Sequence, residues 1–173
     1  MQQQLLEGRS LYAAVSTAFT PGATPDDVFT ITGSATKVVE VVKMGLTTVQ
    51  TTAGVNAWFI RKRSTANSGG TSASAAAVPM DSKLPAATAT ALQYTADPTL
   101  GTSLGDVWSG HVDSPAVATA GIGGLIGVAV DFLALYGQPV RLRGITEVLA
   151  WNFNNAALPA GLSVLAYAVF SER

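Results

Sequence analysis

The sequence predicts an all-β fold, an antiparallel β-sandwich or a jelly-roll-like barrel that follows an N-terminal arm. Short runs rich in Val, Thr, Ile and aromatic residues alternate with clusters of Gly, Pro, Ser and Asp along most of the chain. Two stretches near the C-terminus alternate apolar and polar side chains, as strands with one buried face do. No stretch shows the long amphipathic repeat of a packed helix.

The first 27 residues are predicted to form the arm, and residues 28–173 a single β-sandwich domain. The segment "QQQLLEGRSLYAAV" is compatible with a short helix. The following segment contains Pro21, Gly22 and Pro25, which interrupt regular structure. The domain is therefore expected to begin with the β-branched residues from Val28 onward.

Strands are predicted over residues 38–42 and 46–52, and in "GVNAWFIRKRS" after Gly54. The segment "STANSGGTSASAAAVPMDS" that follows has too few large apolar residues for a hydrophobic face, so it predicts a long surface loop. In "ATATALQYTA" strand-like alternation resumes, with Leu92 and Tyr94 on the side opposite Gln93.

The C-terminal third gives the clearest strand patterns. Val140 and Leu142 alternate with two arginines, and Leu149, Trp151 and Phe153 share one face of the next stretch. Both stretches predict half-buried strands. The last stretch, "LSVLAYAVFSE", predicts a strand that is apolar on both faces.

Composition and charge narrow the class of function. The chain has 173 residues, with ten Lys and Arg against eleven Asp and Glu, a formal net charge of -1. Such a balance favours neither nucleic acid nor an anionic membrane as a partner. Charged residues make up only 12% of the chain, about half the usual fraction, which is typical of a protein that covers much of its surface with neighbours. The absence of cysteine excludes disulfides and thiolate chemistry.

The most apolar segment is "AVATAGIGGLIGVAV" at residues 116–130, and it raises the question of a membrane-spanning helix. Its 15 residues fall short of the roughly 20 that a spanning helix needs, and Asp131 would lie inside any extension. The segment is expected to be a glycine-rich loop that enters a buried strand. The N-terminal residues also lack the basic and apolar regions of a secretory signal.

The sequence gives little support for a catalytic function. His111 is the single histidine and lies near Asp113 and Ser114, but residues this close on one strand cannot form a hydrolytic triad, so a hydrogen-bonded surface pair is expected. The glycines of "GIGGLIG" do not fit a dinucleotide-binding loop. One His, no Cys and two adjacent acids (Asp26 and Asp27) do not match a metal site. The sequence thus predicts no catalytic residue, no cofactor and no metal.

The strongest local charge is the run Arg61, Lys62 and Arg63, at a strand end close to Trp58 and Phe59. One interpretation is a contact with nucleic acid or with an acidic protein surface. The other is a solvated strand end whose charge prevents aggregation. Overall neutrality favours the solvated end or a protein contact over nucleic acid.

Three linked stretches carry a resemblance to a known family. They are "FTITGSATKVVEVVKMGLTT", "FIRKRSTANSGGTSASAAAVPMDSKLPAATATALQYTADPTLGT" and "GQPVRLRGITEVLAWNFNNAALPAGLSVLAYAVFSE", which together cover roughly residues 28–172. In these stretches the sequence resembles small virion structural proteins of tailed bacteriophages, of the head-decoration or capsid-stabilising type. The N-terminal arm and "TAGIGGLIGVAV" depart from the family pattern.

The resemblance implies a non-enzymatic capsid decoration or cement protein. Such a protein binds the major capsid protein on the outer surface of the phage head, as a homo-oligomer for which the family suggests a trimer. Its small-residue loop would lie against a neighbouring chain or in solvent, and the apolar 122–136 region would supply an oligomer core. The residues expected to contact the capsid or other copies are Leu5, Leu6, Leu11, Tyr12, Arg61, Lys62 and Arg63.

Two other hypotheses remain open on the sequence. The first is a tail- or fibre-associated module that binds a host surface glycan or acts as an adaptor, with Trp108 and Tyr94 as candidate exposed aromatics. A β-sandwich serves either role, so the fold alone does not decide between them. The second is a hydrolase that uses His111, and that residue is its only support.

Overall fold

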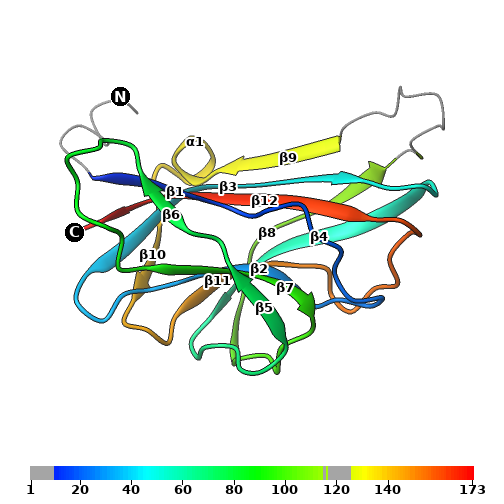
Figure 1. The fold of residues 1–173 in the computed structure, drawn as a ribbon, viewed down its shortest axis with the longest axis horizontal. Helices are drawn as coiled ribbons and strands as arrows, with labels where there is room; N and C mark the ends of the chain where they lie inside the picture. Colours follow the sequence, from blue (N-terminus) through cyan, green and yellow to red (C-terminus); the bar gives the residue numbers. More distant parts are fainter. Residues whose placement is uncertain (1–9, 115, 117–125) are drawn as a thin grey trace.

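The computed structural model describes residues 10–114, 116 and 126–173, without the side chains of residues 113, 114 and 126. In this part of the chain, two antiparallel β-sheets stack face to face (Figure 1). The strands are β1 (Leu11–Val15), β2 (Asp27–Thr32), β3 (Val38–Val49), β4 (Gly54–Arg63), β5 (Thr71–Ser74), β6 (Ala77–Pro79), β7 (Thr90–Ala96), β8 (Ser103–Ser114), β9 (Ile126–Asp131), β10 (Val140–Arg143), β11 (Val148–Asn152) and β12 (Ser163–Glu172).

The chain passes back and forth between the two sheets, so each sheet contains strands from distant parts of the sequence. Sheet A has the order β10-β3-β12-β1-β6, with β9 pairing the second half of β3, and sheet B has the order β5-β7-β2-β11-β4-β8. The sheets do not close on each other, so the β-sandwich that the sequence predicts is confirmed and the barrel alternative is not adopted.

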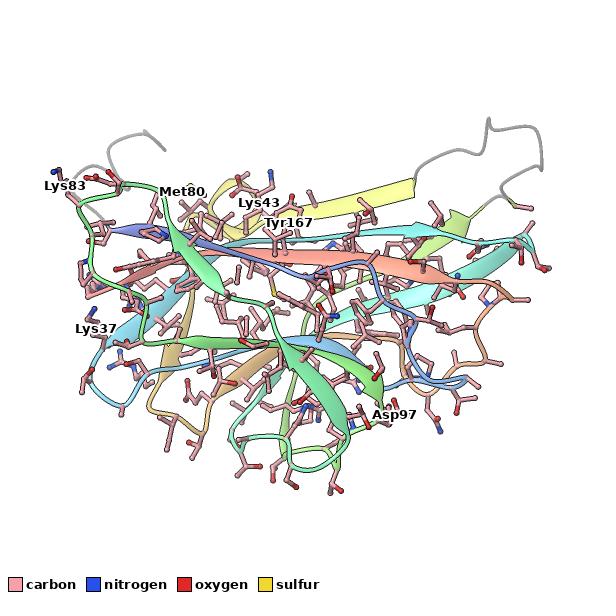
Figure 2. The ribbon with its side chains drawn as sticks, viewed as in Figure 1. Lys37, Lys43, Met80, Lys83, Asp97 and Tyr167 are labelled. Carbon is pink, nitrogen blue, oxygen red and sulfur yellow. The ribbon has the colours of Figure 1, made fainter. Side chains whose placement is uncertain are left out.

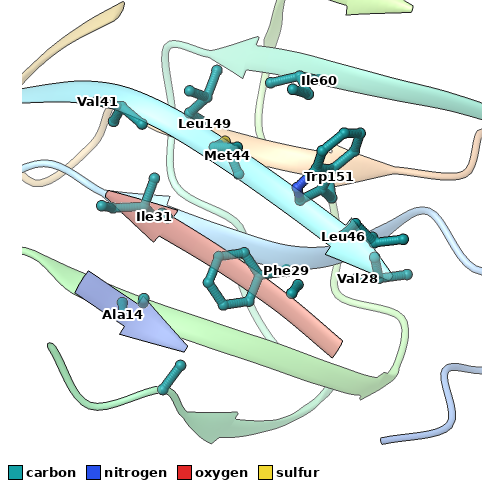
Figure 3. Packing of buried hydrophobic residues seen from close by; sticks show 14 of the residues in the cluster. Ala14, Val28, Phe29, Ile31, Val41, Met44, Leu46, Ile60, Leu149 and Trp151 are labelled. Carbon is teal, nitrogen blue, oxygen red and sulfur yellow. The ribbon is translucent and has the colours of Figure 1, made fainter. Parts of the chain in front are cut away.

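The core lies between the sheets because strands of both present apolar side chains inward at every second position. On β3, Met44 and Leu46 face sheet B, and on β11 Leu149 and Trp151 face sheet A (Figure 3). All four side chains are fully buried, each stabilising the fold by about 1.5–3 kcal/mol relative to exposure.

The predicted alternation of the C-terminal third is correct for β10 and incomplete for β11. In β10, which lies at the edge of sheet A, Leu142 is buried and the two arginines are exposed. In β11 all five residues are buried, including Ala150 and Asn152 on the face away from the core. The reason is position: β11 pairs with β2 and β4 in the middle of sheet B, and loops cover its second face.

The N-terminal strand of sheet A was not predicted from the sequence. Residues 11–15 form β1, which pairs with β12 on one side and β6 on the other, and Phe19 continues with a bridge to Val164. Sheet A therefore begins at Leu11, inside the segment expected to be an arm. Pairing on both sides supplies the backbone hydrogen bonds that a short apolar segment lacks by itself.

Strands β9 and β10 lie one after the other along β3, joined by the helix α1 (Phe132–Tyr136). The Asp131 carboxylate accepts a hydrogen bond from the Ala134 N–H at the start of α1, and Gly137 ends it in the left-handed conformation. Phe132 and Leu133 are buried in the chain's own core. Phe132 and Leu133 therefore cannot contribute to the oligomer core expected at 122–136; for the other described residues of that segment it stays a prediction, and residues 122–125 lie outside the described residues. At five residues, α1 is too short to cross a membrane, and the described part of the chain holds no helix that could.

The small-residue segment is more ordered than the predicted long loop. It contains β5, all of whose side chains are exposed, at one edge of sheet B, and β6 at one edge of sheet A. The segment thus links the two sheets. In β7 the predicted alternation is confirmed: Gln93 faces the core together with Ala91, and Leu92 and Tyr94 lie on the opposite face, where Tyr94 is also buried.

Candidate docking surfaces

The three consecutive cations of β4 do not form one patch: Lys62 points to the face opposite Arg61 and Arg63, and Arg63 is buried whereas Arg61 is not. Arg63 is buried with Asp27 of β2. Its Nε lies 2.7 Å from Asp27 Oδ2 and its Nη2 lies 2.8 Å from Oδ1, a bidentate pair. The prediction of Arg63 as a docking residue is wrong, since this guanidinium is enclosed.

Polar groups from the loops complete the surroundings of this pair. Asn67 and Asn152 each donate a side-chain hydrogen bond of 2.7 Å to the Asp27 carboxylate. Arg63 Nη1 also donates to the Gly101 carbonyl at 2.9 Å, and the Gly101 N–H donates to Asn67 Oδ1. We call these five residues the Asp27 cluster. It fixes the loops after β4 and before β8 against the outer face of sheet B.

The other two cations are at the surface but have partners. Arg61 forms a two-bonded ion pair with Asp106 of β8 and lies over the Phe59 ring. Lys62 lies 3.2 Å from the Glu147 carboxylate and donates to the Arg141 carbonyl at 2.8 Å. Both cations are neutralised within the chain, so they supply no basic patch for an acidic partner.

The predicted N-terminal contact residues divide into three cases. Leu5 and Leu6 lie outside the described residues. Tyr12 is fully buried, stacks on Phe170 and donates its hydroxyl hydrogen to the Pro85 carbonyl, so its prediction as a surface contact is wrong. Leu11 is half-buried and lies on the face of sheet A that points away from the core.

That face carries exposed apolar side chains on several neighbouring strands. Neighbouring strands β6, β1, β12, β3 and β9 contribute to it side by side. The most exposed of its apolar side chains are Val78, Met80 and Val15, at 57–61% of full exposure, followed by Leu165 and Val49. We call this surface the outer face of sheet A; its residues are Leu11, Ala13, Val15, Thr47, Val49, Val78, Met80, Ala129, Leu165, Tyr167 and Val169.

Charge is sparse on the outer face of sheet A and the surface is smooth. Lys43 stands directly across from Asp131, so the two charges cancel within the face. Gly45 lies beneath Tyr167: a Cβ on this glycine would come 2.1 Å from the phenol ring. The ring therefore covers the glycine backbone. Figure 2 shows Met80, Lys43 and Tyr167 on the same side of the molecule.

At one end of this face a cluster of charges is satisfied internally. The buried Glu40 carboxylate accepts hydrogen bonds from Arg141 and Arg173. Close by, the buried Glu172 accepts from Lys37 at 2.9 Å and from the Ala89 N–H at 2.7 Å. Burial by itself raises the pKa of Glu172, but the hydrogen bonds from Ala89, Lys37 and Thr88 outweigh it and hold the pKa below its ordinary value.

A surface hollow lies beside Lys62, with a volume of about 420 Å³. Its wall combines apolar and polar side chains from β4, β8, α1, β10 and the turn between α1 and β10. The lining residues are Lys62, Val107, Tyr136, Gln138, Pro139, Val140 and Arg141. Lys62 is paired with Glu147, and the Tyr136 hydroxyl donates to the Val107 carbonyl at 2.7 Å. The hollow is therefore ordered by internal bonds.

The remaining sequence candidates lie apart from both surfaces. His111 is exposed on β8, across from Ala57, and the side chain of Asp113 lies outside the described residues. The candidate sugar-binding aromatics are not free: Tyr94 is buried, and Trp108 packs edge-on against Trp151. Within the described residues, no three His, Asp or Glu side chains gather as a metal site would require.

Sequence reasoning missed both the Asp27 cluster and the outer face of sheet A. The signal for the outer face was present in β12, where Leu165, Tyr167 and Val169 make the second side of the strand apolar. Comparison with known proteins adds no further identification: no family model matches the chain, and neither does any curated protein or any solved structure.

Proposed function

We propose that this chain is a non-enzymatic virion structural protein of a tailed bacteriophage, a decoration or cement protein of the capsid. In this function it binds the major capsid protein on the outer surface of the head and associates with further copies of itself, as a trimer by analogy with the family that the sequence resembles. The observation that carries the proposal is the outer face of sheet A, an apolar sheet surface that no other described element covers.

The physical argument starts from the cost of leaving such a face in water. An apolar patch of this extent on a folded chain marks a surface that other proteins cover. The small proportion of charged residues in the whole chain, 12%, agrees with extensive contact between proteins. A protein that binds only the assembled shell adds its binding free energy to that shell, and many identical weak contacts then act together.

A second candidate function has one observation in its favour. The hollow beside Lys62 has the size of a small-ligand site, and Tyr136 and Gln138 in its wall are residue types that contact sugars. This arrangement supports a tail- or fibre-associated module that binds a host surface glycan. The polar groups of the hollow already bond within the chain, and for this reason we favour the capsid function.

The test of the proposal is the copy number of the chain in purified virions. Quantitative mass spectrometry would compare it with the major capsid and portal proteins. We expect hundreds of copies per particle, and we expect particles that lack the chain to release their genome at a lower temperature. A handful of copies would overturn the capsid function and favour an adaptor or a glycan-binding module of the tail. Glycan-array binding by Tyr136→Ala and wild-type protein then separates those two.

A further inference from the structure

We propose that the outer face of sheet A is a contact between protomers, packed against the same face of a second copy of this chain. A face that contacts itself makes a two-fold pair, so this contact joins copies in pairs and does not by itself build the trimer of the family analogy. The inference deepens the proposed function, on which it rests for the expectation that copies associate. It assigns that association to a defined surface. Its partner is the chain itself and not the capsid protein, a glycan or a nucleic acid.

The first support is the extent and continuity of the apolar surface. Val78, Val15 and Leu165 come from β6, β1 and β12, which are adjacent strands of one sheet, so their side chains form a single patch. Exposed fractions of 44–61% leave about half of each of these three side chains in contact with water. Such exposure on three neighbouring strands differs from the scattered apolar residues of ordinary surfaces.

The second support is area. The five most exposed apolar side chains of the outer face of sheet A are 42–61% exposed and lie on neighbouring strands, which gives an apolar patch on the order of several hundred Å². A standard protein interface takes about 800 Å² from each partner. The face is therefore of the size that a contact between protomers needs.

The third support is charge. Lys43 and Asp131 stand in register on β3 and β9, so their charges offset each other, and at one end of the face Arg141 and Arg173 are bonded to the Glu40 carboxylate. A neutral face does not repel a second copy of itself, and it offers no net charge to attract a strongly basic or acidic partner. Self-association is thus compatible with the electrostatics, whereas a contact with nucleic acid is not favoured.

The fourth support is shape. Sheets pack face to face about 10 Å apart, which requires a surface without tall or irregular side chains. On this face Tyr167 lies over Gly45, and Ala13 and Ala129 add little height. The surface is thereby level enough for another sheet layer.

The experiment compares matched valine substitutions on the two sheets. Val78→Asp changes the outer face of sheet A, and Val55→Asp changes the exposed side of β4 in sheet B; the exposures of the two valines are 61% and 65%. Analytical ultracentrifugation of each purified full-length chain over a range of concentrations gives the dissociation constant between copies. Circular dichroism during heating checks that every variant is folded.

We expect the wild-type chain to self-associate. Val78→Asp should raise the dissociation constant by about 100-fold or more, since it would bury an unpaired carboxylate between protomers. Val55→Asp should change the constant by less than about threefold, as a rim or exposed site does. Leu165→Asp, on a different strand of the same face, should repeat the effect of Val78→Asp and so guard against a local folding defect.

Two results would overturn the inference. One is a wild-type chain that stays monomeric at every concentration, and the other is an equal effect of Val78→Asp and Val55→Asp. If the monomer still binds capsids and Val78→Asp abolishes that binding, the face contacts the capsid protein; the inference fails while the proposed function stands. If copies associate through this face but virions hold only a handful, the inference stands and the capsid function fails.

Discussion

The outer faces of the two sheets differ in polarity and in whether the chain itself covers them. The outer face of sheet B is polar near β2 and β11, and the chain's own loops close over it through the Asp27 cluster. The outer face of sheet A is apolar and remains open across five strands. The two faces belong to one sandwich of similar strands, so the difference arises from the side chains and not from the architecture.

The difference follows from what each kind of surface requires. A buried carboxylate and guanidinium need hydrogen-bond partners at fixed positions, and only segments of the same chain are certain to supply them during folding. An apolar face needs no such partners, because the hydrophobic effect has no preferred direction. An apolar face can therefore stay exposed after folding until another molecule covers it.

The largest expected effect comes from breaking the closed face. Asp27→Ala leaves the buried Arg63 guanidinium without its counter-charge, together with unsatisfied amide donors on Asn67 and Asn152. We expect the free energy of unfolding to fall by about 3–5 kcal/mol, the usual cost of one unpaired buried charge. Urea denaturation of the variant at neutral pH measures it.

Arg61, two residues before Arg63, provides a control. Arg61→Ala removes a partly exposed ion pair with Asp106, which should cost about 0.2–1 kcal/mol. Combining Asp27→Leu with Arg63→Met should cost less than Asp27→Ala, because no charge is then left unpaired. Equal losses for Asp27→Ala and Arg61→Ala would contradict the distinction between an enclosed and a partly exposed ion pair on sheet B.

A smaller effect, dependent on pH, is expected at the edge of sheet A. The pKa of Glu172 is lower in the folded chain than its ordinary value of 4.5, so the folded state favours the charged form. The stabilisation is present in full above pH 4.5 and is lost as the pH falls through the lowered pKa. At neutral pH Glu172→Gln should destabilise by about 2 kcal/mol, the scale of hydrogen bonds to a charged group.

Below the folded pKa the wild-type carboxyl is neutral, so the difference between Glu172→Gln and wild type should shrink. Denaturation at pH 7 and at pH 3 measures both gaps. Asp81→Asn offers a matched control at an exposed carboxylate of the neighbouring loop, where a much smaller change is expected. A gap for Glu172→Gln that stays constant between the two pH values would refute the assignment.

The smallest effect concerns the open face itself. Gly45→Ala places a methyl group against the Tyr167 ring, which must move. In wild type we expect little net change, because the strain offsets the gain of about 0.5–1 kcal/mol from replacing a strand glycine. In a Tyr167→Ala background the strain is absent, so the same substitution should stabilise by that amount. A double-mutant cycle of thermal unfolding measures the difference, and additivity of the two substitutions would show that ring and glycine do not interact.

The fold was predictable where each strand carries its own pattern. Period-two alternation predicted β10 correctly, and the same reasoning located β11 and β12. It failed for β1, since the segment "LYAAV" becomes a strand only through pairing with β12 and β6. Partners more than 60 residues away leave no local signal in a short apolar stretch.

The candidate surfaces were harder to predict from the sequence, again because the interacting residues lie far apart along the chain. Arg61, Lys62 and Arg63 look like one basic patch, yet strand geometry points Lys62 to the opposite face, and the two arginines bind different carboxylates. Each cation finds a carboxylate between 36 and 85 positions away in the sequence, at Asp106, Glu147 and Asp27 respectively. The second apolar side of β12 was visible in the sequence, but which layer would cover it depends on the order of strands in the sheet.

The aromatic packing of the core has a consequence for spectroscopy. All three tryptophans of the chain form one cluster, with Trp151 5.7 Å from Trp108 and 6.3 Å from Trp58 between ring centroids. The cluster joins β4, β8 and β11, so indole fluorescence reports on sheet B and on the core. Tyr167 is the only aromatic side chain on the outer face of sheet A. Association through that face should therefore leave the tryptophan emission maximum unchanged while altering tyrosine absorption, and unfolding should shift the tryptophan signal to longer wavelength.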